Sequence, residues 1–177
     1  ERVMGLLGGE RLAFPTIVAI GSHAAEPHHV PTTRALPRDG FVLLDFGCTI
    51  SGYHSDMTRM VFLKKPHGKI AEIHRVVERA QIAAIRAVRA GVPANHIDAI
   101  ARNIITRAGY GQQFIHSTGH GVGKKIHEPP WINTKNTERL KSGMVITIEP
   151  GIYLPGIGGV RIEDTLVVTR TGSRRLT

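Results

Sequence analysis

Residues 41–59 read FVLLDFGCTISGYHSDMTR, and the interpretation of the whole chain starts from this stretch. Its apolar beginning ends on Asp45, a turn follows at Gly52, and Asp56 comes just before a second β-prone run at 58–63. Two extended, partly apolar runs on either side of a glycine-containing turn are typical of a β-hairpin or meander. The sequence therefore predicts a strand pair with an aspartate beside each apolar arm.

Two further acids have similar apolar surroundings. Glu149 ends an apolar run, and Glu163 lies in the segment 160–168, which is rich in Val and Ile. Removing an isolated carboxylate from water costs several kcal/mol unless a cation compensates it. Only Arg59 and Arg161 lie in these segments, so basic side chains are too few for four acids. A pair of divalent metal ions fits better, because carboxylates with one imidazole suit Mn, Co, Zn or Fe.

The imidazole has two candidates in a glycine-rich stretch. His120 lies within residues 116–123, and His127 follows seven positions later. A lone histidine more often makes a structural hydrogen bond, but a glycine-flanked histidine among unpaired acids favours a metal ligand.

The remaining segments predict the scaffold. Apolar residues recur at helical spacing from Ile70 to Val88, and Gly91 is expected to end this helix. A second helix is expected from Pro93 to Gly109. Elsewhere we expect a strand at 16–20, a loop at 21–37, a loop-dominated segment at 114–130, and strands at 145–148 and 160–168.

Composition limits the function classes. The chain has 177 residues, 41% of them hydrophobic and 21% charged, which is usual for one globular domain, 1–177. A single cysteine, Cys48, excludes an internal disulfide and suggests a reducing cytoplasm. The formal net charge of +9 is spread in short groups without a nucleic-acid-binding motif, so we expect a basic surface rather than a nucleic-acid partner. No run has the length of about 20 apolar residues that a membrane span needs.

The beginning of the chain suggests a missing segment. Residue 1 is Glu1 rather than methionine, and residues 1–9 read like the last turns of a helix closed by Gly8-Gly9. We therefore expect that the first part of this domain, and any domain before it, is absent.

Five sets of motifs, in order along the chain, resemble those of the pita-bread metallopeptidases, which include creatinase, aminopeptidase P, prolidase and methionine aminopeptidase. The aspartates are eleven positions apart, as in that family, and the spacing of fourteen between the glutamates agrees with its proline-specific branch. The matching stretches are 44–47, 52–59, 117–130, 147–153 and 158–165.

The resemblance implies an α+β pita-bread fold, with two pseudo-symmetric α/β halves, a curved antiparallel sheet and outer helices. It also implies a dinuclear metal centre, with Mn as the expected ion and Co, Zn or Fe as alternatives. In this centre Asp45 would bind one metal ion and Asp56 and Glu163 would bridge both. His120 and Glu149 would complete the second position.

The resemblance further assigns roles around the metals. A water activated between the two ions would attack the peptide carbonyl, with Glu149 as general base. His28, seventeen residues before Asp45, would meet the substrate, with His29 as the alternative, and His127 would bind the peptide or donate a proton. Arg161 and Tyr153 would orient the ligand carboxylates, although an arginine on a solvent-facing strand remains an alternative for Arg161.

Within the family, the strings at 149–153 and 159–164 are similar to the proline-specific branch, the Xaa-Pro aminopeptidases and prolidases. The expected function is metal-dependent hydrolysis of an Xaa-Pro bond in a peptide with proline at the second position. We also expect a homodimer of the full-length protein and no membrane contact. Methionine aminopeptidase and a non-catalytic binding module are the alternatives. All five ligand positions are present, which disfavours the latter. Aminopeptidase and dipeptidase activity are not separated.

Overall fold

The apolar run before Asp45 forms strand β3 (Phe41–Phe46) of the computed structural model, which describes residues 1–177. It pairs antiparallel with β6 (Met57–Phe62) on one side and with β2 (Ile17–Ile20) on the other. The predicted hairpin is therefore present. It is longer than expected, because β4 (Cys48–Ile50) and β5 (Tyr53–His54) continue it in the same register to its tip.

The N-terminal residues pack beside this tip. Helix α1 (Arg2–Leu6) is a single short turn of helix that ends before Gly8, whose φ is +101°. Strand β1 (Arg11–Leu12) then pairs with β4. After β2, the 3-10 helix η1 (Gly21–Ala25) occupies the start of the expected loop.

The second half of the fold is built on a second long antiparallel pair. Strands β9 (Val145–Ile148) and β12 (Asp164–Val168) pair at one end, and β10 (Gly151–Leu154) and β11 (Gly158–Arg161) pair at the other. The register does not change across the break, since Ile148 pairs with Asp164 and Gly151 with Arg161. The expected single strand at 160–168 is therefore wrong, because residues 162–163 separate two ladders.

A five-stranded sheet surrounds β9, with the order β13-β12-β9-β7-β8. Its other members are β7 (Gly119–Gly121), β8 (Glu128–Ile132) and β13 (Ser173–Arg175). The loop-dominated interpretation of residues 114–130 is thus wrong in part: Pro129 and Pro130 lie in a strand. They are tolerated there because β8 is at the edge of the sheet, where a missing N–H breaks no interior ladder.

Both predicted helices are present and cover one side of the second half. Helix α2 (Gly68–Ala87) packs on α3 (Ala94–Arg107) and on β9, β10 and β11, and a 3-10 turn, η2 (Gly111–Gln113), follows α3. Helix α2 ends at Ala87, four residues before the glycine expected to stop it. Twenty buried residues between helices and strands form the main core, including Ile73, Val77, Ile97, Ile105, Ile146 and Ile148.

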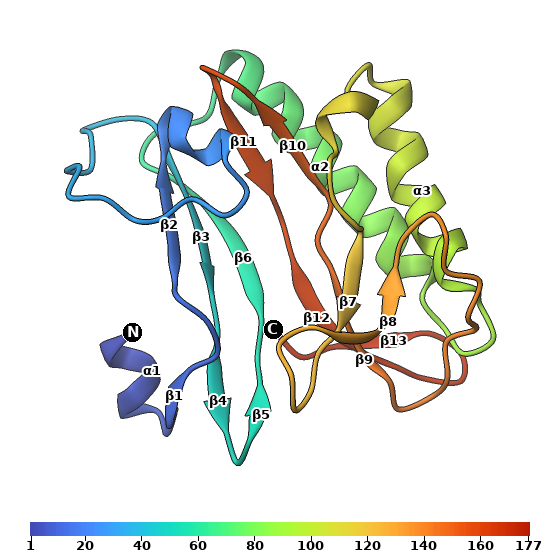
Figure 1. Cartoon of the computed structure of the whole chain (residues 1–177). Helices are drawn as coiled ribbons and strands as arrows, with labels where there is room; N and C mark the ends of the chain where they lie inside the picture. The colour runs from blue at the N-terminus through green and yellow to red at the C-terminus, as the bar shows by residue number, and fades with distance from the viewer.

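Figure 1 shows the blue-to-teal strands β2, β3 and β6 beside the red strands β11 and β12, with α2 and α3 on the far side of the latter. Side chains near the breaks in the two long hairpins can therefore meet between the halves. None of the helices combines the length and the apolar composition needed to cross a bilayer.

A close approach of backbone between the halves predicts a specific sensitivity to substitution at Gly159. A Cβ on Gly159 of β11 would lie 2.1 Å from the carbonyl oxygen of Ala24 in η1. Gly159→Ala should therefore lower the free energy of unfolding by about 3 kcal/mol, because backbone must shift to relieve the overlap. Gly172→Ala is the control, since its Cβ would meet nothing within 4 Å. Equal urea midpoints for the two variants would contradict this packing.

Candidate metal centre

The two predicted aspartates lie on facing arms of the first hairpin. Asp45 pairs with Thr58, and the unchanged register places Asp56 opposite Gly47. Asp45 and Asp56 are therefore diagonal neighbours on one face, which is what a spacing of eleven produces across this turn. Gly47 is required here, because a Cβ would lie 1.9 Å from the carbonyl oxygen of Ser55.

The two predicted glutamates stand opposite each other in the break of the second hairpin. The ladders on both sides share one register, so Glu149 and Glu163 face each other where the strands are not paired. Glu163 is 1% exposed, and one of its oxygens, Oε2, accepts a hydrogen bond of 2.7 Å from Thr58 Oγ1 in the first hairpin. The break thus directs both carboxylates toward the aspartates.

His120 reaches the same place from β7. Its backbone N–H donates to Thr147 Oγ1 at 3.0 Å, and a Cβ on the neighbouring Gly119 would lie 2.0 Å from the Thr147 carbonyl oxygen. The ring atom Nδ1 lies 3.0 Å from the Gly121 carbonyl oxygen, so the hydrogen is on Nδ1 and Nε2 is directed toward the acids. Nε2 is 3.2 Å from Glu149 Oε1 and 3.6 Å from Asp56 Oδ2.

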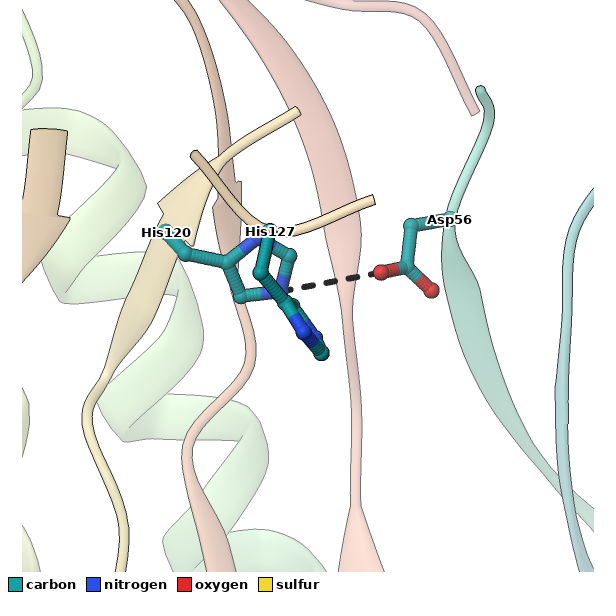
Figure 2. A group of neighbouring side chains, drawn as sticks. All are labelled: Asp56, His120 and His127. Atoms are coloured by element: carbon teal, nitrogen blue, oxygen red, sulfur yellow. Dashed lines mark ion pairs between the residues drawn. The ribbon is translucent and has the colours of Figure 1, made fainter. Parts of the chain in front are cut away.

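The predicted ligands fall into overlapping groups whose donor atoms all lie within 4.8 Å of one another. One group is Asp45, Asp56 and Glu163, a second is His120, Glu149 and Glu163, and a third is Asp56, His120 and His127. Glu163 and Asp56, the two expected bridging residues, each belong to two groups, and so does His120. Figure 2 shows the rings of His120 and His127 next to each other, with Asp56 facing them from the first hairpin.

Arg161 is the arginine that donates to a carboxylate of these four acids. Its Nη2 donates to Asp45 Oδ2 at 2.6 Å, its Nε to Thr58 Oγ1 at 3.0 Å and its Nη1 to the Tyr153 hydroxyl at 2.9 Å. The side chain is buried, so the solvent-facing alternative for Arg161 is wrong. Arg59, the other nearby arginine, pairs instead with Asp164.

The acids are held in unequal protonation states. Burial, with the charges of Asp45 and Glu149, raises the pKa of Asp56 to about 8. Burial also raises the pKa of Asp45 and, together with neighbouring carboxylates, that of Glu163. Burial opposes ionisation of Glu149 as well, but the hydrogen bond and charge of His120 lower its pKa to about 2.

Two buried carboxylate oxygens at this site indicate that its residues fit a bound cation. Oδ1 of Asp45 and Oε1 of Glu163 are buried without any hydrogen-bond partner. An unpaired buried oxygen costs about 1–3 kcal/mol, and a cation beside both would remove that cost together with the repulsion among the acids. Oxygen donors with one imidazole nitrogen suit divalent ions, so the residues present fit metal binding.

The centre forms the floor of a cavity of about 500 Å³. His28 and His127 are exposed on its walls, and the charge of His28 contributes to the lowered pKa of His127. His29 also lines the cavity but is buried, with Nδ1 2.8 Å from Glu26. The structure therefore gives His28, rather than His29, the more accessible ring.

Sequence reasoning missed His116, which belongs to the same motif as His120. Nε2 of His116 lies 2.8 Å from the Tyr153 hydroxyl oxygen, which accepts a hydrogen bond from Arg161. Burial lowers the pKa of His116. Sequence reasoning also missed the pair Asp98 and Arg102 of α3. Their spacing of four on a helix was the available signal.

This helical pair fixes the segment before the metal centre. Arg102 makes two hydrogen bonds of 2.9 Å to fully buried Asp98 and donates to the carbonyl oxygens of Phe114 and His116. Asp98 also accepts from Thr118 Oγ1 at 2.8 Å. The backbone that leads to His120 is thus attached to α3.

Comparison with known proteins agrees with this geometry. Residues 1–170 match the model of metallopeptidase family M24. The chain is 48% identical over 177 residues to the Xaa-Pro dipeptidase of Pyrococcus furiosus, covering all of this chain and 51% of the relative. Among solved structures, prolidase from Pyrococcus furiosus has a TM-score of 0.97 at 47% identity, covering 100% of this chain and 52% of that one. X-Pro aminopeptidase from Thermotoga maritima has a TM-score of 0.96 at 40% identity, covering 100% and 50%.

The fold is the pita-bread fold, as the sequence predicted, and carboxylate and imidazole donors line its cavity. The chain belongs to metallopeptidase family M24. It spans about half the length of the curated relatives it matches.

The raised pKa values predict how pH changes stability without metal. Between pH 5 and 8 the folded state holds a proton on Asp56, whose pKa is about 8, that the unfolded chain, in which an aspartate has a pKa near 4, has lost. The free energy of unfolding in chelator should therefore fall by about 2 kcal/mol or more as pH rises across this window. The lowered pKa of Glu149 changes the free energy of unfolding only below this pH range.

Urea unfolding at several pH values, with chelator and with excess Mn(II), measures this effect. Mn(II) should stabilise most at pH 8, where the carboxylates are ionised and bind best. Asp56→Asn should flatten the pH dependence in chelator. Stability that is constant or rises between pH 5 and 8 would contradict the assigned protonation states.

Removing the arginine of the helical pair should destabilise the fold strongly. Arg102→Met leaves the buried carboxyl group of Asp98 without its ion-pair partner, which costs about 3–5 kcal/mol, whereas exposed pairs contribute at most about 1 kcal/mol. Lys64→Met is the matched control, because Lys64 and Asp39 form an exposed ion pair. Equal losses in urea denaturation would show that the Asp98 pair is not structurally important.

Proposed function

We propose that the natural protein is a metal-dependent exopeptidase that hydrolyses an Xaa-Pro bond at the N-terminus of peptides or in dipeptides. The observation that supports this most directly is the convergence of four acids and His120 on one cavity floor, with two buried oxygens unpartnered. The names of the relatives, Xaa-Pro dipeptidase, prolidase and X-Pro aminopeptidase, support the substrate class. Residues 1–177 would form its catalytic domain.

The proposed metal-binding roles are those that the family resemblance implies, and the closeness of the donor atoms supports them. Asp45 would hold one ion, His120 and Glu149 the other, and Asp56 and Glu163 both, with Mn(II) as the proposed ion. Bound divalent ions lower the pKa of water and stabilise negative charge on a carbonyl oxygen. Arg161 would keep Asp45 ionised and oriented through its bond of 2.6 Å.

Glu149 is the proposed general base. In the structure, its carboxylate is paired with the ring of His120, which keeps its pKa low. As a metal ligand, Nε2 of His120 would carry no proton, and the bound ion would replace the His120 ring as the partner of the Glu149 carboxylate. The position of this carboxylate at the cavity floor would let it accept a proton from water there.

His28 and His127 are the proposed contacts to the peptide. Burial and the charge of His120 lower the pKa of His127, so its ring is neutral at pH 7 and offers one N–H donor and one acceptor. A neutral ring can bind a peptide carbonyl or pass a proton to the departing nitrogen. His116 would act indirectly, through the hydroxyl of Tyr153.

The choice between aminopeptidase and dipeptidase stays open, because relatives of both names are similar along the whole chain. The expected homodimer and cytoplasmic location stay predictions. A basic surface without a nucleic-acid partner is also still a prediction.

The test uses the natural full-length protein with Mn(II) or chelator. It should hydrolyse Xaa-Pro dipeptides or longer Xaa-Pro peptides faster than Met-initiated peptides that lack proline. Glu149→Gln should lower kcat at least about 1,000-fold, because a ligand and a base are altered together. Glu138→Gln, the same change at an exposed position, should have no effect.

Calorimetric titration with Mn(II) gives a second measurement. Asp45→Ala should bind less metal than the parent protein. Unchanged metal binding by this variant would refute the ligand assignment. Preferential cleavage after methionine would favour the methionine aminopeptidase alternative.

A further inference from the structure

Trp131, the single tryptophan of the chain, stands on the cavity wall rather than in a core. Its neighbours in β8, Pro130 and Ile132, are buried, so the alternation of the strand directs Trp131 to the opposite face. The side chain is 42% exposed, which is unusual for so large an apolar ring. A ligand that covered it would remove apolar surface from water.

The ring is placed beside two histidines of the site. Its centroid is 6.4 Å from that of His120 and 6.5 Å from that of His127, and these two rings are 4.4 Å apart at right angles. The other aromatic apolar side chain of the cavity, Phe14, lies before β2 instead, and Ile126, next to His127, is aliphatic. Trp131 is therefore the aromatic surface on the His127 side.

This position matters for an Xaa-Pro bond. The nitrogen that leaves when the bond is hydrolysed belongs to the pyrrolidine ring, so a side chain that reaches it also lies against that ring. If His127 serves the departing nitrogen, the proline ring must lie close to Trp131. The nitrogen of an Xaa-Pro bond has no N–H to be recognised, so shape and apolar contact must distinguish proline.

Aromatic faces suit this task. Proline-rich segments dock against aromatic-lined grooves because the rigid ring offers a flat apolar surface with little entropy to lose. An alanine at the same position has a single methyl group and covers much less of an indole. Trp131 thus favours proline over acyclic residues.

We propose that Trp131 is a specificity-determining residue, on whose indole face the ring of the proline at the second substrate position packs. This inference rests on the proposed Xaa-Pro peptidase function and names the source of its proline preference.

The experiment compares kcat/KM of the natural full-length protein, loaded with Mn(II), on matched Ala-Pro and Ala-Ala substrates. Trp131→Ala should lower kcat/KM about tenfold for the proline substrate and less than about twofold for the alanine substrate. Trp131→Phe should restore most of the preference, whereas Trp131→Leu, apolar but not flat, should not. Tyr53→Ala removes an exposed aromatic ring that lies outside the cavity, so it should leave kcat/KM unchanged for both substrates.

A binding measurement makes the result independent of turnover. The difference in fluorescence between the parent and Trp131→Phe isolates the signal of this tryptophan. With Mn(II), proline should shift that signal at lower concentration than alanine does. The same difference without added ligand is the baseline.

The outcomes separate this inference from the proposed function. Suppose that the parent hydrolyses the Xaa-Pro substrate, and that Trp131→Ala lowers kcat/KM equally for both substrates or for neither. The role of Trp131 is then refuted, while the proposed function stands. If the parent cleaves neither substrate, the proposed function fails and fluorescence alone decides. A proline-selective shift then supports the docking of the ring on Trp131, and equal responses to proline and alanine overturn it.

Discussion

The structure depends on holding four carboxylates close together inside one cavity. Desolvation and mutual repulsion both oppose ionisation there, and the pKa of about 8 for Asp56 shows how strongly. The fold withstands this because the acids are not attached to loops. Each pair is fixed by a long hairpin whose ladders continue in register on both sides, so strand pairing far from the site resists any separation of the charges. Helices α2 and α3 add the apolar core that stabilises the second hairpin.

One guanidinium connects the elements that surround these acids. Arg161 leaves β11 and bonds to Asp45 in β3, to Thr58 in β6 and to Tyr153 in β10, and it also reaches the carbonyl oxygen of Pro27 in the loop before His28. Arginine suits this position because its planar fork offers five donors in fixed directions. The same side chain therefore orients a proposed ligand, joins the two halves and anchors the loop with a proposed substrate histidine.

The sequence contained the local part of this arrangement. The two apolar runs on either side of the Gly52 turn predicted a hairpin, and apolar periodicity predicted both helices. The break at Glu163 was not predictable in the same way, because β12 is separated from β11 by its pairing with β9 rather than by any turn residue. Trp131 was missed because its neighbours are His120 and His127, which no local pattern places beside a strand that contains two prolines. The roles of the metal ligands stay predictions, although the structure brings all five together.

The unchanged register around Glu149 and Glu163 also constrains how such a protein can evolve. The ladder of β9 and β12 sets the opposition of the two glutamates from one side, and that of β10 and β11 sets it from the other. Insertions at the turn near Pro155 lengthen the hairpin tip without moving either acid. An odd insertion within one arm instead turns every later side chain to the opposite face of the sheet. Length variation among related proteins is therefore expected at the tip, while each arm keeps a fixed number of residues between its glutamate and the adjacent ladder.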